Sequence, residues 1–496
     1  MYVIGLDIGT SGVKSTVFDD SANVINHAYA EYDLIFPAAG YVELDPIVLW
    51  EKSCRVLKES VKNLCGGPIR AICITSFGES FVCLDQNRQT LSNTMIYMDT
   101  RGEDESEELA SHIPPNAFYE VTGHYAAPMF AICKLRWLTK HCPHILEKTR
   151  HICFIADYIA LLLGAEHLCD YTLAARSAMF DIKNKDWWDK ALSFAGISRD
   201  ILPQTVPSGT VTGALSPQAA TDLGLTTDVH IIIGGHDQVL AAIGSAVHTV
   251  GDIANGMGTV DCMTAIVDER QLHMDKFLNS NLQVVPYVGQ NLYATFAFNM
   301  SGGCILKWFR DTLSKDIASL PDAYEILGRE AAQSPTDLLL IPYFAGGGTP
   351  YMDAITPATL TGMRLRHTRG DLFRAFMEGE AYEMRRNIDC LSETGLQINR
   401  VVAVGGGANS TLWMQIRADI FDKDIFRPAN KEAGTLASAL LCYASLGLYD
   451  SIAEAQKAII HFADRFSPDS EARIVYARQY QKYISLYNCI KEIYRC

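Results

Sequence analysis

The first twenty residues contain an apolar strand, a glycine-rich polar turn and a second apolar strand, all within the run Val3–Phe18. Gly9 and Gly12 allow the backbone to turn sharply and to point its N–H groups toward an anion. Thr10 and Ser11 add hydroxyl donors to the same turn. The segment therefore predicts a phosphate-binding hairpin, and the alternative is an ordinary hairpin closed by an Asx-type turn.

A carboxylate and a partial repeat strengthen the first interpretation. Asp7, just before the turn, offers an oxygen ligand suited to hydrated Mg²⁺. The segment Gly258–Val267 repeats the order Gly-Thr, four residues, Ser or Thr, a small residue and an aliphatic residue. Two such hairpins in one chain indicate a duplicated domain. The similarity points to the actin, chaperone-ATPase and sugar-kinase class, whose duplicated domains hold a nucleotide between two phosphate hairpins.

Length and charge indicate how many domains to expect and which kinds of partner to exclude. A chain of 496 residues is too long for one core, so two domains are expected. Hydrophobic residues make up 48%, yet no long uncharged apolar run occurs, so we expect no membrane span. The net charge of −15 argues against wrapping nucleic acid, which favours a basic surface. An anionic nucleotide would need local help from lysine, backbone N–H groups and Mg²⁺.

The 14 cysteines are scattered singly, without a Cys-x-x-Cys pair. This pattern is typical of reduced thiols, and no signal-peptide pattern precedes the hairpin, so a cytoplasmic location is expected. His141–His144, His-Cys-Pro-His, is the one cluster that resembles metal ligands, but its spacing fits no standard zinc site.

The chain then alternates strands and helices. We expect three short strands before residue 30, a helix over 46–64 with Asp45 as its N-cap, and a buried parallel strand over 69–75 that ends at the polar tip 76–80. A strand followed by a polar tip is also expected at 81–85 and at 93–101. The strand 229–233 places Asp237 at a strand-to-helix turn, and the small apolar run 239–247 predicts a closely packed helix.

The second half begins with strands from residue 251. It continues with a helix from about residue 303, a strand at 338–342 and a long helix over 370–391. A last strand leads into the glycine turn at 405–410.

An ordered set of motifs along nearly the whole chain resembles the FGGY carbohydrate kinases, the family of xylulokinase, gluconokinase, ribulokinase, rhamnulokinase and glycerol kinase. The motifs are Asp7-x-Gly9-Thr10-Ser11, Tyr97-x-Asp99-Thr100-Arg101, Gly235-x-Asp237-Gln238, Gly258-Thr259, Ser301-Gly302-Gly303, Lys307-Trp308-Phe309-Arg310-Asp311, Pro342-Tyr343, Gly346-Gly347-Gly348-Thr349-Pro350, Glu378-Gly379 and Gly405-Gly406-Gly407. The resemblance implies an α/β fold of two ribonuclease-H-like domains around a central cleft. It places a sugar-binding domain at 1–247 and an ATP-binding domain at 248–496, with ATP-dependent phosphorylation of a sugar or polyol hydroxyl as the activity.

The resemblance assigns Asp237 as the general base that accepts the proton of the attacking hydroxyl. The other interpretation is an N-cap for the following helix, and both roles can coexist. Asp7 is expected to orient Mg²⁺, with Thr10, Ser11 and Lys14 near the transferred phosphate, although a solvated strand lysine is an alternative for Lys14.

The resemblance also assigns residues to ATP in the second domain, where glycines let the backbone approach the nucleotide closely. The expected ATP-binding residues are Gly258, Thr259, Gly303, Lys307, Gly406, Gly407, Asn409 and Ser410.

Xylulokinases carry Met-His where this chain has Gly78-Glu79, and glycerol kinases carry Arg-Glu, so the large neighbour of the carboxylate is missing here. Polar residues expected around the substrate are Glu79, Asp99, Arg101, Asp237 and Gln238. Glu79 disfavours a carboxylate substrate such as gluconate unless Arg101 reaches it. Trp187-Trp188 could stack on a sugar, but core packing is the commoner role of such a pair.

The leading hypothesis is a kinase for a ketopentose such as xylulose. The alternatives are a kinase for glycerol, another short polyol or gluconate, and an actin-like ATP-dependent regulator without transfer activity. Relatives are often dimers, so a homodimer is one option.

Overall fold

The computed structural model describes residues 1–430 and 432–495, which belong to two compact units. Unit 1 comprises Met1–Ala246, Gln283–Ala294 and Glu432–Ile460, and unit 2 comprises Val247–Leu282, Thr295–Lys431 and His461–Cys496. The first break between units, at Ala246 and Val247, lies one residue from the domain boundary expected at 247 and 248. Two later segments nevertheless return to unit 1. Within the described residues, no helix is both long and apolar enough to cross a membrane.

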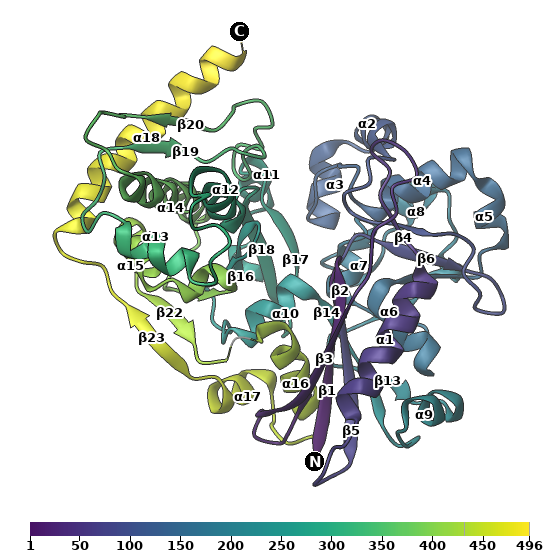
Figure 1. Cartoon of the computed structure of the whole chain (residues 1–496). Helices are drawn as coiled ribbons and strands as arrows, with labels where there is room; N and C mark the ends of the chain where they lie inside the picture. Colours follow the sequence, from purple (N-terminus) through teal and green to yellow (C-terminus); the bar gives the residue numbers. More distant parts are fainter. Residues whose placement is uncertain (431, 496) are drawn as a thin grey trace. The chain divides into compact units, whose positions relative to one another are not determined.

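The sheet of unit 1 contains the amino-terminal hairpin (Figure 1). Its strands, in spatial order, are β13 (Val211–Ala214), β14 (His230–His236), β5 (Ile69–Ser76), β1 (Tyr2–Ile8), β2 (Gly12–Phe18) and β3 (Val24–Glu31). β1, β5 and β14 are parallel, whereas β2 and β3 continue antiparallel from β1. The three expected amino-terminal strands and the buried parallel strand are confirmed.

Helices cover both faces of this sheet. α16 (Ala433–Ser445) packs on β1 and β5, and it approaches so closely that a Cβ at Gly5 would lie 2.6 Å from the Thr435 carbonyl oxygen. α1 (Pro46–Val61) packs on β2 and β3, where Ser15 Oγ lies 2.7 Å from Ser60 Oγ. Because Gly5 pairs with Thr16, and Leu6 with Ser15, these two helices lie on opposite faces. Asp45 caps α1 as expected, accepting from the Ile47 N–H.

The carboxyl ends of the three parallel strands meet at one edge of the sheet. Asp7 is in register with Thr75, and Thr75 with Gly235. The residues that follow β5 and β14 therefore emerge beside Asp7, at the edge where ligands of open α/β sheets gather.

Smaller elements complete unit 1. They are β4 (Glu43–Leu44), β6 (Phe81–Leu84), β7 (Thr94–Met95), α2 (Glu103–His112), α3 (Pro115–Thr122), α4 (Ala131–His141), α5 (Pro143–Lys148), β8 (His151–Phe154), α6 (Ile155–Leu163), β9 (Leu168–Asp170), α7 (Tyr171–Ala175), β10 (Phe180–Asp181), β11 (Asp186–Trp187), α8 (Asp189–Ala195), β12 (Gln204–Val206), α9 (Pro217–Leu223), α10 (Asp237–Gly244), β17 (Gln283–Pro286) and α17 (Ile452–Ile459). The strand expected at 93–101 is reduced to the two residues of β7. Its remainder forms a turn because the Asp99 carboxylate binds two backbone N–H groups, those of Val42 and Arg101.

Unit 2 repeats the scheme of a hairpin beside parallel strands. Its strands run in the order β18 (Leu292–Asn299), β16 (Asp261–Asp268), β15 (Asp252–Met257), β21 (Arg400–Val404), β22 (Ile425–Pro428) and β23 (Phe462–Phe466), with the first residues of β18 belonging to unit 1. β15 is antiparallel to β16 and parallel to β21, as β1 is to β2 and β5. The duplication expected from the two Gly-Thr hairpins is therefore present in the strand order.

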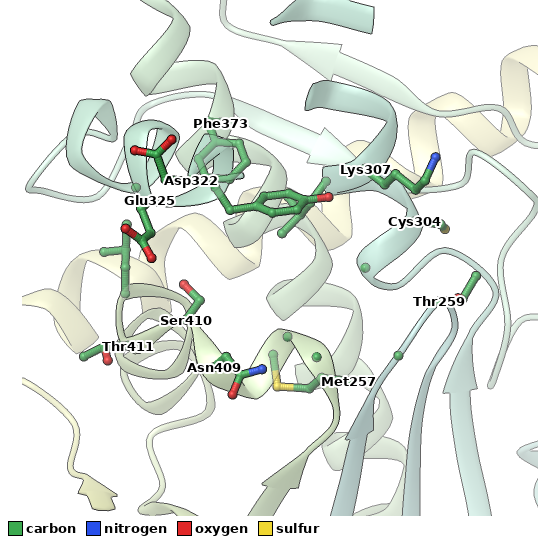
Figure 2. A pocket seen from close by; sticks show the side chains of 18 of the residues that line it. Met257, Thr259, Cys304, Lys307, Asp322, Glu325, Phe373, Asn409, Ser410 and Thr411 are labelled. Carbon is green, nitrogen blue, oxygen red and sulfur yellow. The ribbon is translucent and has the colours of Figure 1, made fainter. Parts of the chain in front are cut away.

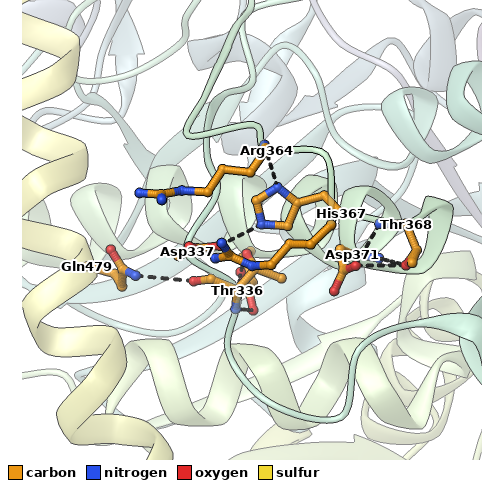
Figure 3. A network of polar contacts seen from close by, with 9 residues as sticks. Thr336, Asp337, Arg364, His367, Thr368, Asp371 and Gln479 are labelled. Atoms are coloured by element: carbon orange, nitrogen blue, oxygen red, sulfur yellow. Dashed lines mark hydrogen bonds and ion pairs between the residues drawn. The ribbon is translucent and has the colours of Figure 1, made fainter.

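Its other elements are α11 (Met274–Asn279), α12 (Gly303–Leu313), α13 (Ala323–Glu330), β19 (Leu339–Ile341), β20 (Thr359–Thr361), α14 (Arg369–Glu393), α15 (Thr411–Phe421) and α18 (Ala472–Arg495). The expected long helix is confirmed as α14. Figure 3 shows how its start is fixed: Thr368 and Asp371 form a capping box, and His367 Nε2 lies 2.8 Å from Asp337 Oδ1.

Candidate active site

Asp7 stands at the carboxyl end of β1, with the phosphate turn after it. Burial raises its pKa to about 6, the positive charge of Lys14 lowers it and the negative charge of Glu432 raises it. Lys14 Nζ donates to Glu432 Oε2 at 2.8 Å, and both side chains are partly exposed. A Cβ at Gly434 would lie 3.1 Å from Asp7 Oδ2, so the glycine leaves room at that oxygen. A single ionised carboxylate with free space beside a phosphate turn fits a hydrated Mg²⁺.

The turn after Asp7 is held from two sides. The Gly9 N–H donates to the Gly12 carbonyl at 3.0 Å, and the Tyr32 hydroxyl donates to the Gly9 carbonyl. Thr10 is half-buried beside Tyr97, while Ser11 is exposed at the tip. The two hydroxyl residues are thus presented by a rigid backbone.

Asp237 is the first residue of α10, directly after the carboxyl end of β14. Burial raises its pKa to about 8, with repulsion from Asp7 and Glu79 adding to the rise. One oxygen accepts from the Gln238 N–H at 2.6 Å and lies 3.3 Å from His236 Nε2. The side chain still keeps 35% of its surface exposed, so a ligand can reach it. The N-cap position itself belongs to His236, and Gln238 is exposed.

Glu79 lies in the turn after β5, with a positive φ of 64° and only 4% exposure. Arg176 Nε donates to Glu79 Oε1 at 2.5 Å, and Nη2 of the same guanidinium donates to the same oxygen. Because the charge of Glu79 raises the pKa of both Asp237 and Tyr97, these three side chains are neighbours. The structure thus brings together Asp7, Glu79 and Asp237, which the sequence assigned separately.

Asp99 and Arg101 form a separate local unit. The Arg101 guanidinium donates to both oxygens of Asp99, at 2.6–3.1 Å, and Nη2 also lies 2.7 Å from Glu43 Oε1. The guanidinium carbon lies 4.3 Å from the centre of the Tyr41 ring. That Asp99 and Arg101 contact the substrate stays a prediction. In the structure, their side chains already bind each other.

Sequence reasoning missed several residues of this region. Arg176, His236, His124 and Gln283 are all buried around Glu79. Burial and the nearby Arg176 charge lower the pKa of both histidines, His124 to about 3, so both rings are neutral. No local pattern marks these residues, because the chain brings them from four different elements. The one sequence signal that pointed toward them was Gly78, where the large side chain next to the carboxylate is missing.

In unit 2, a cavity of about 900 Å³ opens beside the second hairpin (Figure 2). Its lining includes all eight residues expected at ATP in this half of the chain: Gly258, Thr259, Gly303, Lys307, Gly406, Gly407, Asn409 and Ser410. Asp322 and Glu325 at the start of α13 and Phe373 of α14 also line it, and the sequence analysis did not single them out. The cavity is large enough for a nucleotide-sized ligand.

Close backbone contacts shape this cavity. The Gly303 N–H donates to the Gly258 carbonyl at 2.8 Å, and a Cβ at Gly303 would meet that oxygen at the same distance. A Cβ at Gly407 would lie 2.8 Å from the Trp413 ring. Ser410 caps α15 through the Trp413 N–H, and Lys307 extends to Asp311 at 2.8 Å. The glycines therefore let α12 and the 405–410 turn approach their neighbours.

A fully buried ion network supports the second hairpin. Arg417 of α15 donates to Asn255 Oδ1 at 2.7 Å and to the carboxylates of Asp261 and Glu380. Asn255 in turn donates to Asp261 Oδ1 at 2.5 Å. These side chains tie β15 and β16 to α14 and α15.

Two further sequence features have structural roles. Trp187 is buried, its indole N–H donates to the Pro203 carbonyl at 2.8 Å, and it stacks on Phe154, so it packs in the core. His141 ends α4 and stacks on Trp137. The cysteines of the described residues are free thiols, and Cys496 lies outside them.

Among the described residues, ligand atoms of Cys153, Asp157 and His167 lie within 4.8 Å of one another, a grouping the sequence analysis did not identify. Asp157 also caps α6 through the Phe154 N–H, and burial raises the pKa of Cys153 well above its ordinary value. The thiol therefore keeps its proton, as in a structural core.

Comparisons with known proteins give the same assignment over the whole chain. Residues 2–244 match the FGGY family of carbohydrate kinases, N-terminal domain, and residues 253–446 match its C-terminal domain. The xylulose kinase of Bacillus subtilis is 28% identical over 99% of this chain and 96% of its own length. The gluconokinase of Bacillus licheniformis is 26% identical over 98% and 94%. The structure of the xylulose kinase from Rhodospirillum rubrum superposes with a TM-score of 0.89 at 26% identity, covering 100% of both chains.

Proposed function

Because the chain belongs to the FGGY family of carbohydrate kinases and is thus a sugar phosphotransferase that uses ATP, we propose that its acceptor is a hydroxyl of a neutral ketopentose such as xylulose. The main support is the charge around the candidate acceptor site. Asp7, Glu79 and Asp237 are neighbours, and each brings a carboxyl group. A carboxylate substrate would meet repulsion there, whereas hydroxyl groups would find acceptors.

The ion pairs of Arg101 also support a neutral acceptor. Gluconate would need a cation, and Arg101 is the residue from which the sequence analysis expected one. Its guanidinium is instead bound by Asp99 and Glu43. Releasing it would leave buried carboxylates without a partner, which is costly.

Each remaining residue has a proposed role in positioning or in proton transfer. Asp237 takes the proton of the acceptor hydroxyl, and its partly exposed carboxyl group at a strand end suits that role. Thr10, Ser11 and Lys14 contact the transferred phosphate, and the residues that line the unit 2 cavity bind the nucleotide. Asp7 is the proposed ligand of Mg²⁺, which when bound would neutralise phosphate charge.

Gluconate and short polyols are the alternative acceptors, the first because a gluconokinase is among the relatives and the second because Glu79 suits any polyol. A regulator without transfer activity is disfavoured by a carboxyl with an altered pKa at a ligand-accessible position. A cytoplasmic location, expected from the cysteine pattern, and assembly as a homodimer are parts of the proposal that fractionation and light scattering test.

The decisive experiment is a panel of ketopentoses, polyols and aldonates assayed for acceptor-dependent ADP release. We expect a ketopentose to give the highest kcat/KM. Preferred turnover of an aldonate would contradict the charge argument, and ATP hydrolysis independent of every acceptor would favour the regulator.

A further inference from the structure

Glu79 is held by a guanidinium that comes from a distant part of unit 1. Arg176 directly follows α7 and is 97 residues away in sequence, yet both residues are at most 5% exposed and form the buried pair described above. Both of these hydrogen bonds go to one oxygen of Glu79, Oε1. Among the hydrogen bonds between described residues, none reaches Oε2. The pair therefore occupies one oxygen of Glu79 and leaves the other to a ligand.

Gly78 leaves the space that the side chain of Arg176 occupies. A Cβ at this position would lie 3.0 Å from both Cβ and Cγ of Arg176 and 3.1 Å from Cδ2 of His236. These contacts are tighter than side chains normally make, so any larger residue would displace the stem of the arginine. The glycine and the arginine are thus coupled by sterics.

The far side of Arg176 is fixed by neutral groups. Its guanidinium donates to Gln283 Oε1 and lies 5.3 Å from the centre of the Phe130 ring. Gln283 Nε2 donates to the Tyr125 hydroxyl at 3.1 Å. His124 stacks on Phe130 with ring centres 4.7 Å apart. The one carboxylate among these contacts is Glu79, so the position of the arginine is set by that carboxylate and by packing.

We propose that Arg176 is a positioning residue that holds the Glu79 carboxylate with Oε2 directed to the hydroxyls of a neutral sugar, and that Gly78 is required for this arrangement. Without the arginine, the Glu79 side chain would lose the two contacts that fix its orientation. Because Arg176 is already bound by Glu79 and Gln283, it is not available to a substrate carboxylate. The inference rests on the proposed function and adds the residue that determines substrate class.

The experiment compares wild type, Arg176→Met, Arg176→Lys, Glu79→Gln, Gly78→Ala and the double variant Glu79→Gln/Arg176→Met. We expect Arg176→Met and Glu79→Gln each to raise the KM for the preferred sugar about 10-fold or more, with the KM for ATP unchanged. Gly78→Ala should raise the sugar KM in the same direction but less. Since the two side chains act as one unit, the double variant should raise the KM for the sugar no further than the more damaging of the two single variants does. Arg176→Lys should recover part of the loss.

The pH profile separates positioning from general destabilisation. Arg176 lowers the pKa of Asp237, so Arg176→Met should move the acidic limb of kcat/KM to higher pH. The matched control is the Arg136–Glu108 pair on the surface of the same unit, whose variants Arg136→Met and Glu108→Gln should change neither KM nor the limb.

An unchanged sugar KM in folded Arg176→Met, or additive losses in the double variant, would overturn the inference while leaving the kinase activity in place. If Arg176→Met does not fold, the double variant, which buries no unpaired charge, and Arg176→Lys supply the same comparison. Absence of acceptor-dependent ADP release by the wild type on the whole panel would instead contradict the proposed function itself.

Discussion

The two Gly-Thr hairpins share a backbone plan but differ in where they keep their charges. Aligned on this motif, Asp7 of β1 corresponds to Gly256 of β15. The first hairpin places a carboxylate beside its turn, and its Lys14–Glu432 pair is partly exposed. The second has no carboxylate at that position, and its charges, Asp261 with Arg417 and Glu380, are fully buried.

The difference indicates that duplicated hairpins can divide their work. At the first, burial opposes ionisation of Asp7, so the carboxylate is kept there at a cost in stability. At the second, two buried carboxylates share one buried guanidinium, so removing that cation would leave both of them without it. We infer that the charged groups of the first hairpin serve chemistry and those of the second serve structure, and the following predictions test that division.

The largest effect is expected at Asp237, the proposed general base in unit 1. Asp237→Asn keeps the shape of the side chain but cannot take a proton, so kcat should fall by about 10²–10⁴ while the KM for ATP stays near that of the wild type. Steady-state kinetics with the preferred sugar measure this. Asp228→Asn, at an exposed ion pair of the same unit, serves as the control. A kcat within a few fold of wild type would remove Asp237 from catalysis.

In unit 2 the corresponding test targets the buried network. Arg417→Met leaves Asp261 and Glu380 buried without their cation, so the free energy of unfolding should fall by about 3–5 kcal/mol. Denaturant unfolding of the whole chain, followed by circular dichroism for the variant and the wild type, provides the measurement. A loss below about 1 kcal/mol would mean that this hairpin does not depend on its ion network.

Stability and rate should change in opposite directions with pH, because of Asp237 and Asp7 of unit 1. Folding raises the pKa of Asp237 from its ordinary value of 3.8 to about 8, and that of Asp7 from 3.8 to about 6. Between the ordinary and the raised pKa of each group, the folded state therefore binds more protons than the unfolded state. The free energy of unfolding should therefore decrease as pH rises from about 4 to 8, whereas kcat/KM should increase as Asp237 ionises. Asp237→Asn should flatten the stability curve between pH 6 and 8. Thermal unfolding across pH that shows the same slope in both proteins would contradict this assignment.

The smallest effect is expected for the exposed ion pair. Glu432→Gln breaks the Lys14–Glu432 contact where water can replace it, so stability should change by less than about 1 kcal/mol. Urea unfolding of this variant beside Arg417→Met compares an ion pair at each hairpin. A loss as large as that of the buried network would show that burial is not what separates the two.

The sequence determined those features that depend on contiguous residues. Apolar runs separated by glycine turns indicated both hairpins, and the ends of the strands expected at 69–75 and 229–233 indicated where Glu79 and Asp237 would emerge. The cavity residues followed from the motifs that resemble the family, whose glycines fit because close backbone approach requires the absence of a side chain. Local backbone conformation is set by neighbouring residues, so it can be predicted from them.

Only the tertiary structure decided which charges meet. Arg176 joins Glu79 across 97 residues, Gln283 joins Arg176 across 107, and α16 returns from residue 433 to cover β1. By contrast, Arg101 binds Asp99, which is two residues away in the same motif. Such pairings depend on the direction and burial of each side chain after packing, and no local pattern encodes them, because the free energy of a buried charge depends on every group around it.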